Sequence, residues 1–178
     1  MLRNLLIITC LLGTVYITYG QKKRKSKDLI VPPTEQTGVN YKELGSPLPE
    51  LRVVNEKKAI TSKDLQNDAN LFVVMFNPTC EHCQDIAMDL RKNMDTFKNN
   101  KFVWVCSAAM PMGHLDFFRS VTKIDKTPME MGLDSCKLID RAFIYGGLPQ
   151  INIYDKDRKL VHIFAGEIAL DSLKMYAN

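Results

Sequence analysis

An uninterrupted apolar run over residues 71–76 places the strongest constraint on the fold of this chain. Its length suits a β-strand buried on both faces, because a strand with one solvated face alternates apolar and polar side chains. Residues 77–79 interrupt the run, and a helical pattern follows until Asn99-Asn100. A second apolar run at 102–106 reads as another buried strand. A strand, a helix and a further buried strand predict a parallel crossover.

The remaining segments extend this pattern into an α/β fold. Residues 150–154 and 160–164 alternate around a short polar turn, which predicts a β-hairpin at an antiparallel edge. We expect a strand at 51–54, a helix opening at 61–65 with Thr61 or Ser62 as its cap, and helices within 113–122, 135–143 and 168–176. Apart from that helix at 135–143, the secondary structure of residues 125–147 is ambiguous from the sequence. The predicted architecture is a central mixed β-sheet flanked by helices on both faces.

The N-terminus has the layout of a secretory signal peptide. Residues 5–19 are almost wholly apolar, Arg3 precedes them, and Thr18-Tyr19-Gly20 offers small residues for cleavage. We therefore expect a signal peptide at 1–20 and an exported protein, either periplasmic or tethered to the membrane and facing the periplasm. The basic run just after the apolar stretch leaves an uncleaved anchor as the alternative.

The positive charge of the chain is concentrated behind this leader. Six of the 24 basic residues precede Asp28, and from Asp28 onward 18 basic residues face 20 acidic ones. A body without excess positive charge argues against nucleic-acid binding. Residues 21–47 read as a basic, proline-containing linker or arm, which can associate weakly with an acidic membrane surface. The compact domain is expected at 48–178.

The sequence Cys80-Glu81-His82-Cys83 carries the chemistry of the chain. It follows the first buried strand and opens the helix, where free N–H groups and the positive end of the helix dipole favour a thiolate. Cys80, nearest the helix end, is expected to be the nucleophile in disulfide exchange. Cys83 lies one turn deeper on the same face, so it can resolve a mixed disulfide. His82 favours the Cys80 thiolate and Glu81 opposes it, so no reduction potential follows from the motif.

The two segments 76–83 and 147–154 together resemble the thioredoxin superfamily, and in particular the exported TlpA/ResA-like thiol–disulfide oxidoreductases. The resemblance covers roughly residues 48–178. It implies a cis peptide bond before Pro149, which faces the disulfide, and a backbone at Leu148 that receives an extended substrate segment. It also implies protein thiols or disulfides as substrates and an upstream thiol protein as the redox partner. No organic cofactor or metal is implied beyond the redox-active disulfide Cys80–Cys83.

The chain departs from that family at two places. Thr79 stands where family members usually carry tryptophan, and the only tryptophan is Trp104 on the next strand. Many members also carry a buried carboxylate in the strand before the motif, but residues 71–76 contain none. Glu167 is a candidate substitute. These departures concern the rate and direction of the reaction more than the fold.

Two other functions remain open on sequence grounds. One is a thioredoxin-like copper-binding metallochaperone without redox turnover, since soft thiolates suit Cu(I) and Met110, Met112 and His114 lie close together in the chain. The other is a binding module with an inert disulfide. A structural zinc site is disfavoured, because a second pair of ligands at similar spacing is missing from the sequence.

The last two cysteines outside the leader have no assigned role. Cys106 lies in a strongly apolar strand, which favours a buried free thiol. Cys136 either pairs with Cys106 or acts as a regulatory thiol, and sequence does not decide between these, because four cysteines allow three complete pairings.

Overall fold

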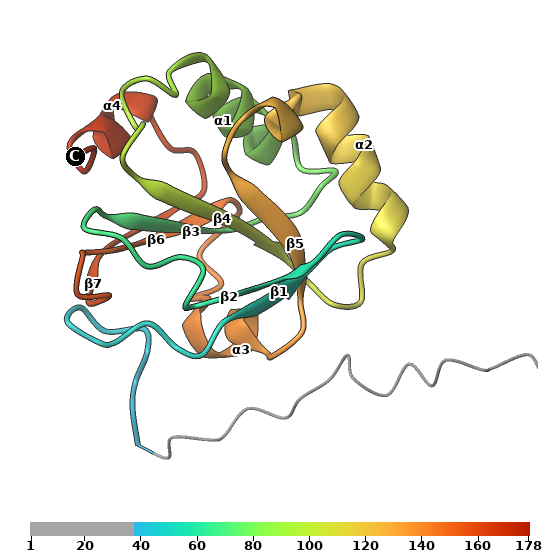
Figure 1. Cartoon of the computed structure of the whole chain (residues 1–178). Coiled ribbons are helices and arrows are strands. Elements are labelled where there is room, and N and C mark those ends of the chain that lie inside the picture. The colour runs from blue at the N-terminus through green and yellow to red at the C-terminus, as the bar shows by residue number, and fades with distance from the viewer. Residues whose placement is uncertain (1–37) are drawn as a thin grey trace, which may run out of the picture.

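The computed structural model describes residues 38–178 (Figure 1). The expected signal peptide at 1–20 lies outside the described residues, as does most of the expected linker at 21–47. Within residues 38–178, no helix combines the length and the apolar character needed to cross a bilayer.

Seven strands form one mixed sheet in the order β2-β1-β5-β4-β3-β6-β7. The strands are β1 (Arg52–Val54), β2 (Ala59–Thr61), β3 (Leu71–Met75), β4 (Lys101–Cys106), β5 (Glu130–Asp134), β6 (Gln150–Tyr154) and β7 (Leu160–Ala165). The helices are α1 (Glu81–Lys92), α2 (Met112–Thr122), α3 (Leu138–Ala142) and α4 (Leu170–Lys174), with a 3-10 turn at Ile124–Lys126.

The centre of the sheet has the predicted crossover. β3 and β4 run parallel, with Val73 opposite Val103, and α1 connects them. β6 pairs antiparallel with β3, and β7 completes the hairpin at the sheet edge. The expected mixed sheet, its parallel crossover and its C-terminal hairpin are therefore confirmed.

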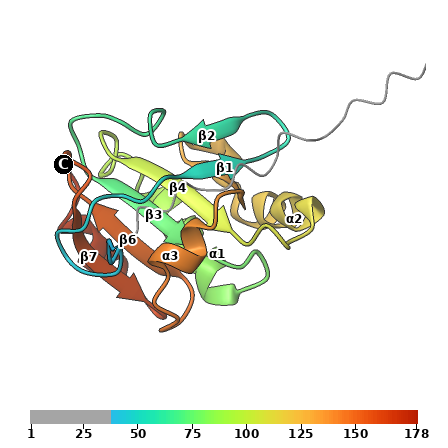
Figure 2. The same cartoon turned by 90° about the horizontal axis from the view of Figure 1, so that it is seen from below.

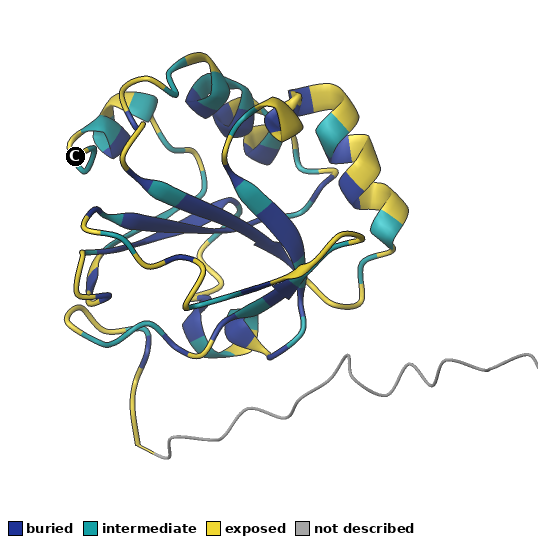
Figure 3. Cartoon of the chain, viewed as in Figure 1, coloured by how far each residue is buried: buried dark blue, intermediate teal, exposed yellow. Residues whose placement is uncertain are grey.

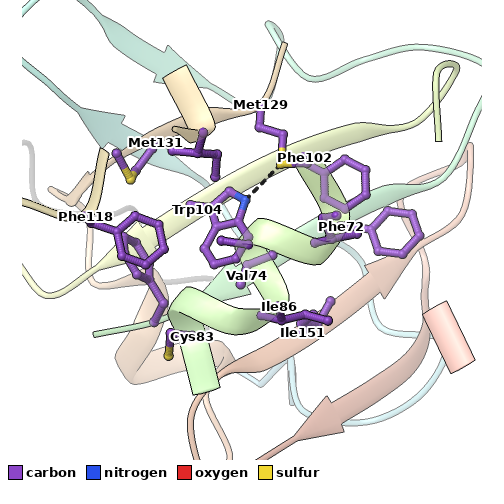
Figure 4. Close-up of a cluster of buried hydrophobic side chains, with 14 of the residues drawn as sticks. Phe72, Val74, Cys83, Ile86, Phe102, Trp104, Phe118, Met129, Met131 and Ile151 are labelled. Atoms are coloured by element: carbon purple, nitrogen blue, oxygen red, sulfur yellow. Dashed lines mark hydrogen bonds between the residues drawn. The ribbon is translucent and has the colours of Figure 1, made fainter. Parts of the chain in front are cut away.

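Alternate side chains of β3 enter two separate cores, because successive residues of a strand point to opposite faces. Phe72 and Val74 join one core with residues of α1, α2 and α4, and a close-up shows Trp104 at its centre (Figure 4). Leu71, Val73 and Met75 join the second core, which α3 covers. Helix α3 lies on the sheet face opposite α1 (Figure 1), and the view from below has α3 in front of the strands (Figure 2). All five residues of β3 are buried, as Figure 3 shows for the central strands.

Three local expectations were wrong or incomplete. The expected helix at 61–65 is a turn, because the Asp64 carboxylate accepts hydrogen bonds from the Thr61 backbone N–H and hydroxyl, both at 2.7 Å. The helix after the cysteine motif ends at Lys92, where the Asn93 backbone N–H bonds to Asp89 and Leu90 carbonyls. Strand β5, within the ambiguous stretch, and strand β2 were not predicted.

The packed body also includes residues that precede position 48. Gly45 N–H donates to the Leu160 carbonyl at 2.7 Å, and Leu160 N–H donates to the Ser46 carbonyl at 2.8 Å. Tyr41 is buried. The described end of the arm is therefore attached to the start of β7 by backbone hydrogen bonds.

Candidate active site

Cys80 occupies the N-cap position of α1. Its backbone is extended, and the Gln84 N–H donates to the Cys80 carbonyl at 3.1 Å, which begins the helix. The preceding turn is held by Asn77, whose side-chain oxygen accepts from the Thr79 N–H at 3.0 Å and whose carbonyl accepts from the Cys80 N–H at 3.0 Å. The short Asn-Pro-Thr turn thus carries the chain from the end of β3 directly to the helix start.

Cys83 lies behind Cys80 and has no exposed surface. Burial is the main cause that raises the pKa of the Cys83 thiol, and a hydrogen bond with Cys80 and the charge of Cys80 raise it further. A hydrogen bond with the Asn77 backbone acts in the opposite direction. Cys80 is only partly buried, so it is the sulfur of this pair that another protein can reach.

The loop before β6 completes the site. The Leu148–Pro149 peptide bond is cis. The Cys80 Sγ lies 3.9 Å from the Leu148 carbonyl oxygen, although the two residues are far apart in sequence. The structure therefore brings Cys80, Cys83 and Leu148-Pro149 together beside the end of β3 and the start of β6.

Two buried amides hold this loop in place. The Gln150 Oε1 accepts from the Ile144 N–H at 2.7 Å, and its Nε2 donates to the Ala142 carbonyl at 3.0 Å and to the Asn152 Oδ1 at 2.6 Å. The Asn152 Nδ2 also donates to the Ala142 carbonyl, at 3.3 Å. Gln150 and Asn152 have no exposed surface. Buried amides with satisfied partners restrict the conformations of the segment they bind, here residues 142–148.

A hollow of about 170 Å³ opens between this loop and the turn that leads to Cys80. We call it the Leu148 hollow. Its lining is mostly apolar and consists of Met75, Phe76, Asn77, Ser107, Met110, Ile139, Phe143, Tyr145 and Leu148. The ring centroids of Phe143 and Tyr145 lie 4.6 Å apart. Tyr145 is largely exposed and forms part of the rim.

The charged residues of the motif lie on the outside of α1. Glu81 and His82 are exposed. Glu167, the candidate substitute for a buried carboxylate, is also exposed and borders a small hollow with His82, Asp85 and Asp89. The groups that shift the pKa of Cys83 do not include it. Glu167 is therefore placed beside His82 and not beside the buried thiol.

Cys106 and Cys136 are both buried and free. Cys106 belongs to the core under α1 and α2, whereas Cys136 belongs to the core on the opposite face of the sheet. A disulfide between Cys106 and Cys136 was one of the alternatives. That alternative is wrong, because the sheet separates the two cysteines. Burial is the main cause that raises the pKa of each thiol, to about 12 for Cys106.

The methionines that suggested copper lie at the start of α2. The Met110 Sδ is 2.8 Å from the His114 Nδ1, and Met110 also lines the Leu148 hollow. Among residues 38–178, no group of three or more His, Cys, Asp and Glu side chains is arranged to hold a metal ion.

Sequence reasoning did not identify Asn77, Gln150 or Asn152 as parts of the site. The Asn-Pro dipeptide was a turn signal that could have indicated the role of Asn77. Gln150 and Asn152 alternate with Ile151 and Ile153, and that pattern reads as the solvated face of an edge strand. Their burial depends on α3, whose packing the sequence does not reveal.

Several solved structures have a fold similar to this one, and bacterial proteins are among them. A candidate protein disulfide isomerase from Bacteroides thetaiotaomicron matches with a TM-score of 0.62 at 15% identity, over 77% of this chain and 89% of that one. The thioredoxin domain of a thiol–disulfide oxidoreductase from Bacteroides vulgatus matches with a TM-score of 0.58 at 16% identity, over 76% and 99%. A secreted Mycobacterium tuberculosis disulfide oxidoreductase homologous to DsbE matches with a TM-score of 0.57 at 14% identity, over 70% and 92%.

Comparisons of sequence gave no match. No protein-family model and no curated protein matches the chain. At 14–16% identity, the likeness to these solved structures is a likeness of fold.

Proposed function

We propose that this chain, which has the thioredoxin-like fold, is a thiol–disulfide oxidoreductase that acts through Cys80 and Cys83. The observation that carries the proposal is the pairing of an accessible sulfur with a buried one. Cys80 is partly exposed at the N-terminus of α1, where N–H groups and the helix dipole stabilise an anion. Cys83 is fully buried in contact with it.

The exchange proceeds in two steps that conserve atoms and electrons. The Cys80 thiolate attacks one sulfur of a substrate disulfide, forms a mixed disulfide and releases the other substrate sulfur as a thiolate. Cys83 then loses its proton, which the released substrate thiolate takes up through solvent, and attacks the Cys80 sulfur. The Cys80–Cys83 disulfide forms, and the second substrate thiolate leaves. Two electrons pass from the cysteine pair to the substrate, and the same steps in reverse oxidise a substrate dithiol.

The raised pKa of Cys83 supports this order of events. A buried thiol that keeps its proton does not compete with Cys80 for the substrate. The charge of Cys80 contributes to that shift, so conversion of the Cys80 thiolate into a mixed disulfide removes one of its causes. Cys83 therefore becomes easier to deprotonate after the first step, when its attack is needed.

The substrate in this proposal is an extended protein segment that lies against Leu148-Pro149. The support is the 3.9 Å separation of the Cys80 Sγ and the Leu148 carbonyl oxygen, since a backbone N–H of a segment bonded to Cys80 can donate to that oxygen. Electrons are exchanged with a second thiol protein. The exported location, and any weak contact of the basic arm with a membrane, remain proposals drawn from the apolar leader and the basic run.

Reduction of a protein disulfide by the reduced chain tests the proposal. Cys80→Ser should abolish exchange, and Cys83→Ser should trap mixed disulfides that run as higher-mass species under non-reducing conditions. Cys106→Ser is the control and should retain both the activity and the wild-type pattern. Full activity of Cys80→Ser would rule out the mechanism. Stoichiometric Cu(I) uptake by a chain without exchange activity would favour the metallochaperone instead.

The direction of electron flow needs a separate measurement. Equilibration with glutathione gives the reduction potential of the Cys80–Cys83 pair, and about 30 mV corresponds to about 1.4 kcal/mol for a two-electron couple. A potential well below that of glutathione identifies a reductant, and one well above it identifies an oxidant.

A further inference from the structure

We infer that Asn77 is a positioning residue for the second step of the exchange, in which Cys83 attacks the Cys80 sulfur. The Asn77 side chain fixes the turn before α1, and the fixed turn directs the Asn77 backbone N–H at the Cys83 sulfur. This inference rests on the proposed function, because that function assigns the second step to Cys83. It adds the residue that controls the rate of that step.

The turn between β3 and α1 is held by the Asn77 side chain. Its Oδ1 accepts from the Thr79 N–H at 3.0 Å and from the Thr79 hydroxyl at 2.9 Å. The Asn77 carbonyl accepts from the Cys80 N–H at 3.0 Å, and the Pro78 carbonyl accepts from the Gln84 amide at 3.0 Å. An asparagine side chain that bonds to the backbone two residues on favours one conformation of a turn. The direction of the Asn77 backbone therefore depends on its own side chain.

The hydrogen bond from the Asn77 backbone favours the thiolate form of Cys83. Cys83 has no exposed surface and belongs to the core drawn in Figure 4. Burial raises the pKa of its thiol, and a hydrogen bond with Cys80 and the charge of Cys80 raise it further. The Asn77 backbone lowers that pKa, and among residues 38–178 the groups that shift it include no cation. An ionised sulfur in such a site is stabilised chiefly by hydrogen bonds that are already in place.

This contact affects the second step of the exchange much more than the first. In the first step the Cys80 thiolate attacks from the N-terminal end of α1, and Cys83 keeps its proton. In the second step Cys83 carries the negative charge in a buried site. Residues 71–75 of β3 contain no carboxylate that could take up its proton. A change that moves the Asn77 N–H away from Cys83 therefore raises the barrier of the second step alone.

The reaction of the reduced full chain with dithiobis-nitrobenzoate separates the two steps, because each step releases one coloured thionitrobenzoate. The Cys80 thiolate attacks the reagent disulfide, forms a mixed disulfide and releases the first thionitrobenzoate. Cys83 then loses its proton to solvent, attacks the Cys80 sulfur and releases the second one. The Cys80–Cys83 disulfide forms, and the reagent gains two electrons. Stopped-flow absorbance measures the rate of each release.

Asn77→Ala should slow the second release about tenfold or more, the order expected when a hydrogen bond to a charged group is lost. The first release should change by less than about threefold. Asn93→Ala is the matched control at the other end of α1, where the Asn93 side chain donates to the Asp89 carbonyl at 2.9 Å. This control loses a comparable hydrogen bond without a contact to either cysteine, so both releases should keep their wild-type rates.

Thr79→Val and Thr79→Ser form a second matched pair at an exposed position. Valine keeps the shape of the side chain but loses the hydroxyl that donates to the Asn77 Oδ1, whereas serine keeps that donor. Thr79→Val should slow the second release a few-fold, and Thr79→Ser should restore it.

Three results would overturn the role of Asn77 and leave the proposed function standing. They are an unchanged second release in Asn77→Ala, equal slowing of both releases in that variant, and equal second releases in Thr79→Val and Thr79→Ser. A wild-type chain that releases no second thionitrobenzoate would overturn the proposed function as well.

Discussion

The Cys80 sulfur lies 3.9 Å from the carbonyl oxygen of Leu148, across a sequence separation of 68 positions. The register of the sheet produces this proximity. Met75 at the end of β3 is opposite Gln150 at the start of β6, so the turn that leaves β3 lies beside the loop that enters β6. The N-terminal end of α1 and the candidate docking loop are thus positioned by a single antiparallel strand pair.

Native-state alkylation should distinguish Cys80 from the other described cysteines. Cys80 is partly exposed, whereas Cys83, Cys106 and Cys136 are buried. Reaction of a buried thiol requires a local opening, and an opening that costs about 3 kcal/mol slows the reaction by about two orders of magnitude. Iodoacetamide treatment of the reduced protein, followed by peptide mass mapping over time, measures the order in which the cysteines are alkylated. Equal rates for Cys80 and Cys83 would contradict the assigned roles.

Replacement of Gln150 by leucine should destabilise the protein by about 2 kcal/mol, because the Ile144 N–H would be buried without its acceptor. Urea unfolding monitored by Trp104, the only tryptophan and a fully buried one, measures the change. Gln84→Leu is the control. The Gln84 amide donates to the Pro78 carbonyl at 3.0 Å at a less buried position, so its loss should cost less than about 1 kcal/mol. Similar losses for the two variants would refute the role of Gln150.

Gly132 on β5 should not tolerate alanine. An added Cβ would lie 2.5 Å from the Val54 carbonyl oxygen and 2.9 Å from a Val53 methyl group, where β1 crosses close to β5. Overpacking against backbone typically costs about 1–3 kcal/mol. Gly113→Ala on α2 is the matched control, since a Cβ there meets nothing within 4 Å and alanine favours a helix by up to about 1 kcal/mol. Thermal unfolding should show a lower Tm for the first variant and an unchanged or higher one for the second.

The stability of the reduced protein should fall at alkaline pH. Burial raises the pKa of Cys106 from 9.0 to about 12, so the unfolded chain releases this proton first. The stabilisation that results from this difference in pKa between the folded and unfolded chain is fully present below pH 9 and is lost as the pH rises toward 12. Within that window each such thiol lowers the free energy of unfolding by about 1.4 kcal/mol per pH unit. Urea titrations at pH 8, 9 and 10 with reductant measure the slope. Cys106→Val should have a shallower slope, and an unchanged one would contradict the assignment.

The central strands could be predicted from sequence because their side chains alone indicate strands that are buried on both faces. Residues 71–76 and 102–106 are apolar throughout, and such runs are stable only between two packed layers. The N-cap position of Cys80 was equally predictable, since a strand, a turn and a helical pattern follow one another without interruption. Four residues expected at the site, namely Cys80, Cys83, Leu148 and Pro149, lie together in the structure.

The elements that were missed depend on contacts between distant segments. β5 contains Glu130, Gly132 and Asp134 among its five residues, so its composition does not favour a strand. It forms because β4 pairs with it on one side and β1 on the other. Thr61 and Asp64 have the spacing of a helix cap, but the carboxylate closes a turn instead, since no helical pattern follows to be capped.

The position of Cys136 determines when during folding it can form a disulfide. Its sulfur accepts a hydrogen bond from the Arg52 N–H at 3.1 Å and donates to the Glu50 carbonyl at 3.3 Å, on the sheet face away from the core that contains Cys83 and Cys106. Once the strands have paired, no other described cysteine is within reach of it. A disulfide between Cys136 and Cys80, Cys83 or Cys106 of the same chain therefore identifies a molecule that oxidised before it folded, and a non-reducing peptide map measures the fraction of such molecules.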